Sequence, residues 1–347
     1  MKDITQIGQI LVPVPLNRNM IAPINQAIYF HEKFGSDIVL LHVESELPFI
    51  QKWFPWRIQK KHRKKALKRF RRQVKHFFPG NPLVKQFEYD LVIGKLIPSI
   101  LRVSNRRKSD LVIIKKARRT QGKASIFRKE NADKLISDSR CPVMTIYKEP
   151  KIKGIKRILL PVDVTKNSDK KVAWAISLAK VFGASIHIVS VQHLEIERVH
   201  SLSYNKGRRI ERDIKKQGID VDLVLLKAEK RTADEVVLEY AKKLKPDLLL
   251  IMTHQETILF DNYLGAFARE IVHQSRVPVI VLSLRRTALS LTYLNQWKRG
   301  SRFFSRVLTK IINDKIEERS QYIRKGGYWS GKYSVLTKLL KTDIAKK

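Results

Sequence analysis

The sequence has a single cysteine and no long hydrophobic run, and both shortages limit what the protein can be. Cys141 alone cannot form an intrachain disulfide, which agrees with a reducing compartment. No apolar run approaches the ~20 residues that a membrane-spanning helix needs. Met1 leads straight into a predicted strand, with no signal sequence before it. These features together predict a cytoplasmic protein.

Acidic residues are also scarce. The 347 residues include 32 aspartates and glutamates against 70 lysines and arginines, a formal net charge of +38. Charge of one sign on this scale opposes a compact state unless a polyanion neutralises it. Solubility is the simpler interpretation, but acidic residues improve solubility more than basic ones do. The excess therefore favours a protein that binds a polyanion.

The chain is long enough for two domains and an appendage, and 43% of its residues are hydrophobic, as in globular proteins. Its two halves repeat one another. The matching segments are Ile10–Val14 with Ile158–Val162, Asp110–Ile114 with Asp247–Ile251, and Ser139–Val143 with Ser275–Val279. Recurrence at a fixed offset indicates one structural unit present twice. We expect these units at residues 1–148 and 155–284, followed by a C-terminal extension over 285–347.

Short apolar runs alternate with amphipathic segments in both repeats. Runs of about five apolar residues are typical of parallel strands that helices cover on both faces. We therefore expect the α/β class: two tandem open five-stranded, mostly parallel sheets with flanking helices, plus a helical basic tail. The strands are expected at residues 9–14, 37–43, 86–92, 111–114 and 143–147, then at 158–162, 186–191, 221–226, 248–252 and 279–282.

The last strand of each repeat, Val143–Tyr147 or Val279–Leu282, would leave an exposed sheet edge. Antiparallel pairing of the two strands would cover both edges, so we expect the repeats to form an intramolecular pseudo-dimer. Within the repeats, Gly35 should end a helix in the left-handed conformation. Thr232 with Glu235 should begin another helix through a capping box.

Three segments concentrate the positive charge. From Lys52 to His76 there are twelve lysines and arginines and no acid. Apolar residues recur there at helical spacing, which predicts a helix with one face on the sheet and a cationic outer face. The second segment is the loop from Lys115 to Lys123, and the third is the extension, with sixteen basic and four acidic residues. The residues that we expect to contact phosphates are Lys60, Lys61, Arg63, Lys64, Lys68, Arg69, Arg71, Arg72, Lys115, Lys116, Arg118, Arg119, Lys298, Arg299 and Arg302.

The order of strands and helices, the strand end Leu160–Asp163 and the strand–loop–helix–Pro-Val close resemble the universal stress protein family. The resemblance covers residues 5–284, twice over, and leaves out the extension. It implies an open five-stranded, Rossmann-like fold. Some members bind ATP through an acid that ends strand one, a backbone at the end of strand two and a Gly-x-x-Gly-x9-Gly-Ser/Thr loop. Other members lack that loop and bind no nucleotide.

Carried onto repeat two, the resemblance assigns Asp163 to the acid, Val191 to the backbone position and Gly265 to the last glycine. Met252 and Gln255 replace the first two glycines, so the backbone cannot approach a triphosphate as closely. We therefore expect no bound cofactor, with weak ATP binding to repeat two left open. The simpler interpretation is that Asp163 is a turn acid and Gly265 a packing glycine.

Repeat one departs further from the family pattern, because Pro15 stands at the acid position and a basic run, Lys115–Arg119, replaces the loop. No metal-ligand spacing or catalytic motif is visible, so we expect a protein that is not an enzyme. The sequence favours binding to structured RNA, such as the ribosome, by shape and charge, with duplex DNA left open. The alternatives are ATP sensing by repeat two and docking at an anionic membrane through Trp53 and Trp56.

Overall fold

A computed structural model describes residues 7–44, 56–116, 127–147, 154–163, 168–192, 197–253 and 264–283. All of them belong to one compact unit, Met1–Arg285. The predicted C-terminal extension lies outside the described residues. No helix in the described part of the chain is long and apolar enough to cross a membrane.

The elements alternate as the apolar runs predicted. In repeat one they are β1 (Gln9–Pro13), α1 (Ile21–Phe34), β2 (Asp37–Glu44), α2 (Trp56–Phe77), β3 (Glu88–Ile93), α3 (Leu96–Arg107), β4 (Leu111–Lys115), α4 (Lys129–Asp138) and β5 (Val143–Ile146), with 3-10 turns at Arg18–Met20 and Pro82–Lys85. In repeat two they are β6 (Arg157–Pro161), α5 (Asp169–Phe182), β7 (Ser185–Gln192), α6 (Glu197–Lys215), β8 (Val221–Lys227), α7 (Ala233–Leu244), β9 (Leu248–Met252), α8 (Ala266–Gln274) and β10 (Val279–Leu282).

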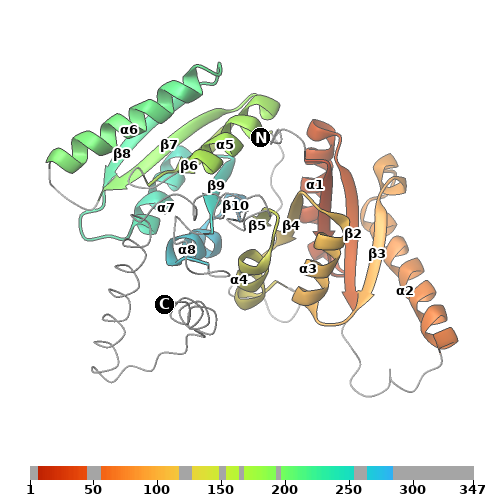
Figure 1. The fold of residues 1–347 in the computed structure, drawn as a ribbon. Coiled ribbons are helices and arrows are strands. Elements are labelled where there is room, and N and C mark those ends of the chain that lie inside the picture. Colours follow the sequence, from red (N-terminus) through yellow and green to blue (C-terminus); the bar gives the residue numbers. More distant parts are fainter. Residues whose placement is uncertain are drawn as a thin grey trace, which may run out of the picture. The chain divides into compact units, whose positions relative to one another are not determined.

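The ten strands form one continuous sheet in the order β3-β2-β1-β4-β5-β10-β9-β6-β7-β8 (Figure 1). Neighbouring strands are parallel except at the centre, where β5 and β10 pair antiparallel. This pairing joins the two expected five-stranded sheets and covers both of their inner edges, as the sequence predicted. The two outer strands of the sheet are then β3 in repeat one and β8 in repeat two.

The central pairing is symmetric at the level of single residues. Met144 faces Ile280, Val143 faces Val281, and Thr145 faces Val279. Val143 and Val279 hold equivalent places in the two repeats, because each follows a Ser-Arg-x-Pro sequence. A pseudo-two-fold axis therefore passes through the Met144–Ile280 pair, as in an isologous dimer whose two subunits are one chain.

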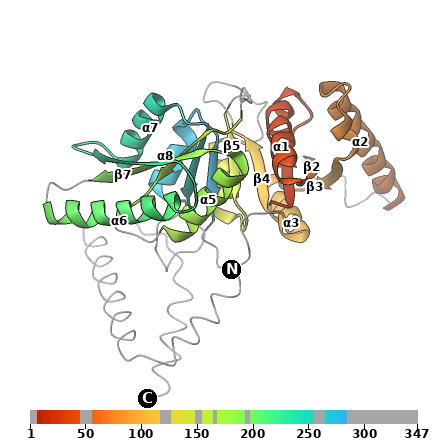
Figure 2. The same cartoon turned by 90° about the horizontal axis from the view of Figure 1, so that it is seen from above.

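Helices cover both faces of the sheet (Figures 1 and 2). On one face α1, α2, α5 and α6 contribute to a single core cluster, and on the other α3, α4, α7 and α8 contribute to a second. Side chains of a strand alternate between the two: Ile10 and Val12 lie in the first cluster and Leu11 in the second. Gly35 and the matching Gly183 end α1 and α5 with positive φ angles of 67° and 65°, and the predicted Thr232–Glu235 capping box begins α7.

The repeats contact each other on the first face through an aromatic cluster between α1 and α5. The ring of Tyr29 stacks on Phe182 with centroids 5.6 Å apart, and Phe34 meets Phe182 edge-on at 5.5 Å. The Tyr29 hydroxyl oxygen accepts a hydrogen bond from the backbone N–H of buried Ile155 at 3.0 Å. Burial raises the pKa of Tyr29. The two repeats therefore share one core on this face.

Candidate functional site

Helix α2 has one buried face and one cationic face. Phe70 and Val74 are fully buried, and the Phe70 ring meets Tyr89 of β3 edge-on at 5.4 Å. Opposite them lies a row of exposed cations that we call the α2 basic face. It consists of Arg63, Lys64, Lys65, Lys68, Arg69, Arg71, Arg72 and Lys75. The side chains of Lys60 and Lys61, which were also predicted to bind, lie outside the described residues.

One arginine of the α2 basic face is held by an aromatic ring. The Arg71 guanidinium lies over the Tyr89 ring, 5.3 Å from its centroid, within the range of a cation–π contact. The Tyr89 hydroxyl donates to the carbonyl of Val84 at 3.1 Å. Burial raises the pKa of Tyr89, and the nearby Arg71 charge offsets part of that rise. Arg71 is therefore pre-ordered on the surface of repeat one.

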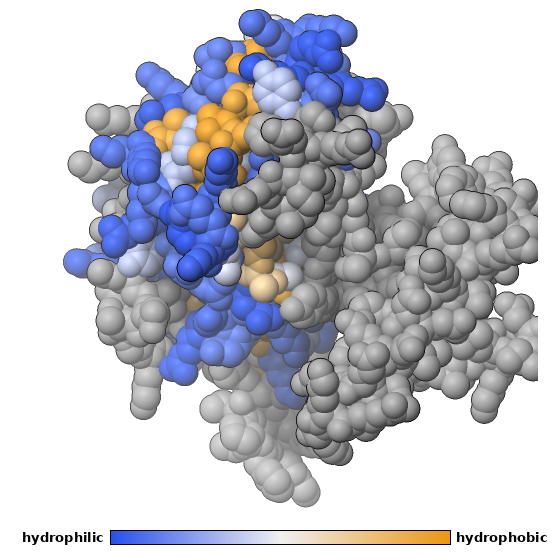
Figure 3. Space-filling model, turned by 90° about the vertical axis from the view of Figure 1, so that its left-hand side faces the viewer, coloured by the Kyte–Doolittle hydropathy of each residue, from blue (hydrophilic) through white to orange (hydrophobic). Residues whose placement is uncertain are grey.

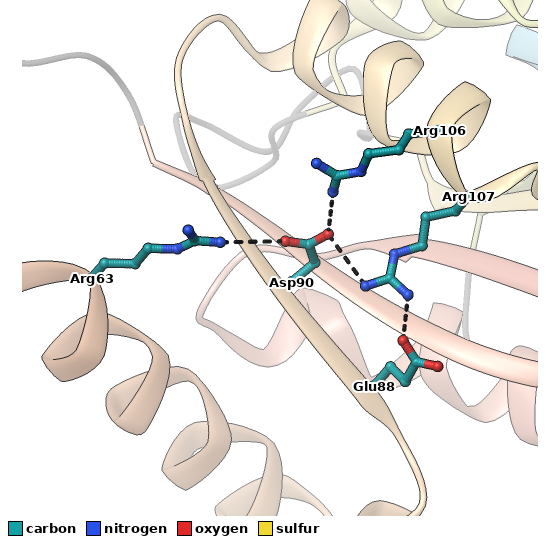
Figure 4. A network of polar contacts seen from close by, with 5 residues as sticks. All are labelled: Arg63, Glu88, Asp90, Arg106 and Arg107. Carbon is teal, nitrogen blue, oxygen red and sulfur yellow. Dashed lines mark hydrogen bonds and ion pairs between the residues drawn. The ribbon is translucent and has the colours of Figure 1, made fainter. Parts of the chain in front are cut away.

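A second group of arginines surrounds Asp90 on the outer strand β3 (Figure 4). Its carboxylate accepts a hydrogen bond from Arg106 Nη2 at 2.8 Å, and Arg107 Nη2 lies at 3.6 Å and Arg63 Nη2 at 4.0 Å. Arg107 also donates to Glu88. The Asp90 side chain is only 7% exposed, whereas those of Arg63 and Arg106 are 64% and 60% exposed. The buried carboxylate thus holds guanidiniums from α2 and α3 beside one strand.

The predicted contact at Lys116 is wrong. This residue follows β4 and is only 5% exposed. Its ammonium donates to the carbonyls of Val272, Ser275 (2.7 Å) and His273 (3.4 Å) at the C-terminal end of α8. A cation there interacts favourably with the helix dipole. Burial lowers the pKa of Lys116 to about 8. Lys116 therefore joins repeat one to repeat two and cannot reach a phosphate.

The other members of the second basic segment are placed differently. Lys115 is half-buried and donates from Nζ to Asn19 Oδ1 at 3.0 Å. Arg118 and Arg119 lie outside the described residues, as do Lys298, Arg299 and Arg302 of the extension. Among the residues that the structure describes, the cationic site consists of the α2 basic face and the arginines around Asp90.

Further polar contacts between the repeats accompany Lys116. Asp133 of α4 accepts from His273 Nε2 at 2.6 Å, and Arg269 Nε lies 3.5 Å from its other carboxylate oxygen. Sequence reasoning missed these partners because they are about 140 residues apart and belong to no motif. Only the pseudo-symmetric pairing of β5 with β10 brings α4 against α8.

The three residues expected to bind nucleotide lie at the carboxyl ends of neighbouring strands. Asp163 follows β6, Val191 is in β7, and Gly265 precedes α8 after β9. Because β6 lies between β9 and β7, this is the point where strand order reverses and where α/β sheets bind ligands. The Gly265 N–H, however, donates to the carbonyl of Thr253 at 3.0 Å. That donor is already used within the chain.

Two further side chains near these strand ends are buried. Met252, at the first glycine position, is buried at the end of β9. Lys171 in the first turn of α5 is also buried, and its ammonium donates to the carbonyl of Pro161 at the end of β6. No pattern in the sequence indicated a role for Lys171, because it stands in an ordinary amphipathic helix. No group of three His, Cys, Asp or Glu side chains able to hold a metal ion occurs among the described residues.

Comparison with known proteins agrees with this architecture. Residues 154–283, which are repeat two, match the model of the universal stress protein family. Repeat two is therefore similar to a universal stress protein domain. A universal stress protein of Methanocaldococcus jannaschii is 27% identical over 141 residues, which are 37% of this chain and 81% of that relative.

Solved structures resemble this chain over both repeats. A universal stress protein from Archaeoglobus fulgidus has a TM-score of 0.58 at 16% identity and covers 80% of this chain and 97% of its own. A functionally unknown protein from Pseudomonas aeruginosa has a TM-score of 0.55 at 18% identity and covers 81% of this chain and 94% of its own. At these identities the likeness shows the fold, which is the predicted Rossmann-like class.

Proposed function

We propose that this protein is a member of the universal stress protein family and binds structured RNA, such as ribosomal RNA, through the α2 basic face. The observation that carries the proposal is the composition of one exposed helix surface. Helix α2 contains eleven lysines and arginines and no acidic residue, while Phe70 and Val74 fix its orientation on the sheet. A row of charges that are all positive suits a phosphate backbone. Binding would release the counterions of that backbone.

The equivalent helix of repeat two supports this choice by contrast. Helix α6 carries six basic and three acidic residues. Arg208 pairs with Glu211 at 2.7 Å and lies over the Tyr204 ring at 5.0 Å, so part of its charge is neutralised locally. Figure 3 shows the side of the molecule with α6 and β8, where hydrophobic atoms interrupt the hydrophilic surface. In β8, residues 223–226 are apolar and only half-buried. Repeat one is therefore the better polyanion surface.

The strand ends of repeat two support the absence of tight ATP binding. A triphosphate loop needs free backbone N–H groups and glycines that let it approach. Here the Gly265 N–H is bonded to Thr253, and the side chain of Met252 occupies the first glycine position. We infer that this protein acts by binding rather than by catalysis or nucleotide hydrolysis.

RNA fits this surface better than duplex DNA does. Long flexible lysines and arginines contact phosphates and follow shape, whereas DNA sequence is read by side chains inserted into the major groove. The α2 basic face consists only of lysines and arginines, and the sequence shows no helix-turn-helix or zinc-finger signature. Folded RNA offers closely spaced phosphates on a shape-specific surface that such a face can contact.

The test is a salt titration of RNA affinity. Fluorescence anisotropy would be measured with a labelled ribosomal RNA fragment, for the wild type, for K64Q/K68Q/R72Q on the α2 basic face, and for the matched α6 variant R209Q/R212Q/K215Q. We expect wild-type affinity to fall about 10³-fold or more between roughly 50 and 200 mM salt. The α2 variant should lose about 3 from the log–log salt slope and the α6 variant much less. Equal losses would overturn the assignment to α2, and tighter binding to duplex DNA or anionic vesicles would overturn the choice of RNA.

A further inference from the structure

The arginines around Asp90 make contacts from both faces of the sheet. Arg63 comes from α2, which covers one face, and Arg106 and Arg107 come from α3, which covers the other (Figure 4). They meet at β3, the outer strand of the sheet, where no other strand of the described residues pairs with one side. The cluster therefore carries positive charge around the open edge of repeat one.

The two exposed arginines keep most of their donors unused by Asp90. A guanidinium has five N–H donors in a planar fork that matches phosphate oxygens. Arg106 directs Nη2 to one carboxylate oxygen at 2.8 Å, and Arg63 directs Nη2 toward the other at 4.0 Å. Both side chains are more than half exposed. Asp90 thus holds Arg106 by a hydrogen bond and Arg63 by a longer ion pair, and both arginine side chains are largely exposed.

Protection of the sheet edge explains only part of this arrangement. Charged side chains on an outer strand do prevent edge-to-edge pairing. One buried carboxylate and one exposed Glu88, however, leave three guanidiniums with an uncompensated positive charge. A buried carboxylate that contacts more arginines than it can neutralise orders their side chains. An arginine that is already ordered loses less entropy when it binds a ligand.

We propose that the Asp90 cluster is a phosphate clamp in which Arg63 and Arg106 grip the RNA backbone and Asp90 positions them. It extends the α2 basic face, of which Arg63 is the first member, around the β3 edge toward α3. The clamp rests on the proposed function, since it assigns a second contact to the same RNA. Its ligand is a phosphodiester oxygen, because the fork geometry and the exposure of both side chains suit that group.

Substitution of Asp90 distinguishes the clamp from simple charge attraction. D90N removes one negative charge, so an interaction governed by net charge would become tighter. If Asp90 positions the arginines, D90N weakens RNA binding even though the protein becomes more positive. D90E keeps the charge and should retain more of the affinity than D90N does.

Substitution of the arginines is the second part of the experiment. It leaves the buried Asp90 in place. R63Q/R106Q and the control R209Q/R212Q each remove two exposed charges, and the control lies on the equivalent helix of repeat two. Affinity for the labelled ribosomal RNA fragment would be measured across salt concentrations on proteins with matching far-ultraviolet circular dichroism. We expect R63Q/R106Q to lower the log–log salt slope by about 2 and to weaken binding about tenfold or more near 0.1 M salt. The control should leave both nearly unchanged.

The outcomes separate the clamp from the wider proposal. If the wild type binds RNA and K64Q/K68Q/R72Q weakens it, but R63Q/R106Q behaves like the control, the clamp is wrong and the α2 basic face stands. Tighter RNA binding by D90N would also overturn the positioning role. If the wild type shows no salt-dependent binding to RNA, the proposed function itself is wrong.

Discussion

Replacement of the buried Lys116 should change how the stability of the protein depends on pH. Its ammonium is inside the junction of the repeats, bonded to three carbonyls at the C-terminal end of α8 and 5.4 Å from the Tyr147 ring centroid. Burial lowers its pKa from the ordinary 10.5 to about 8. Between these values the unfolded chain holds a proton that the folded protein has released. The free energy of unfolding therefore rises with pH across this window.

The size of the effect follows from the shift. One pKa unit corresponds to about 1.4 kcal/mol, so the full window is worth roughly 3 kcal/mol. From roughly pH 7.5 to 9.5, the folded group loses most of its proton while the unfolded group keeps it. Lys116 should then add about 2 kcal/mol to the free energy of unfolding. Measurements stay below pH 10 because burial raises the pKa of Tyr29 from 10.0. Above that pH the unfolded tyrosine releases its proton while the folded one keeps it, which lowers the free energy of unfolding.

The assay is urea unfolding, followed by circular dichroism, at those two pH values. We compare the wild type with Lys116→Met, which removes the titrating group, and with Lys116→Arg, which keeps its charge throughout. Lys75→Met on the exposed side of α2 serves as the control. Both Lys116 variants should lack the rise of about 2 kcal/mol in the free energy of unfolding. Lys75→Met should retain it. An equal rise in all four proteins would refute the burial of a titrating Lys116.

Three further predictions test the fold and the nucleotide position of repeat two. Tyr29→Phe keeps the stack on Phe182 but leaves the Ile155 N–H without its acceptor, so urea unfolding should show a loss of about 1–3 kcal/mol; an unchanged midpoint would contradict the bond. Phe70→Ala empties a fully buried site under α2 and should cost about 3–5 kcal/mol in the same assay; a cost below ~1 kcal/mol would mean that α2 is not packed there. Isothermal titration calorimetry with magnesium-ATP should show no binding tighter than ~1 mM, and a micromolar Kd would contradict the occupied Gly265 N–H.

Local patterns in the sequence were sufficient to predict the fold. The apolar runs place all ten strands within a few residues, because a strand buried on both faces has little freedom in composition. The repeated Ser-Arg-x-Pro-Val segments identify β5 and β10 as equivalent edges, and their pairing follows from the cost of leaving two edges open. Gly35 and the Thr232 capping box mark helix ends by conformation and hydrogen bonding that depend on neighbouring residues alone.

The candidate site was predictable only where it depends on a single helix. The helical spacing of Phe70 and Val74 predicts which side of α2 is exposed. Lys116 sits in a run of cations that looks solvated, and nothing near it in sequence reveals carbonyl partners 156 to 159 residues away. The Asp90 cluster likewise requires two helices on opposite faces to meet at one strand. Such contacts arise from tertiary geometry, which a one-dimensional pattern does not encode.

The most direct test of the central claim is purification of the full-length protein from its own cells at low salt without nuclease. The retained nucleic acid would be sequenced and its release followed as salt is raised. RNA binding by the α2 basic face predicts that structured RNA copurifies, dissociates steeply between roughly 50 and 200 mM salt, and is lost from K64Q/K68Q/R72Q. Absence of RNA, or equal retention by that variant, would contradict the account.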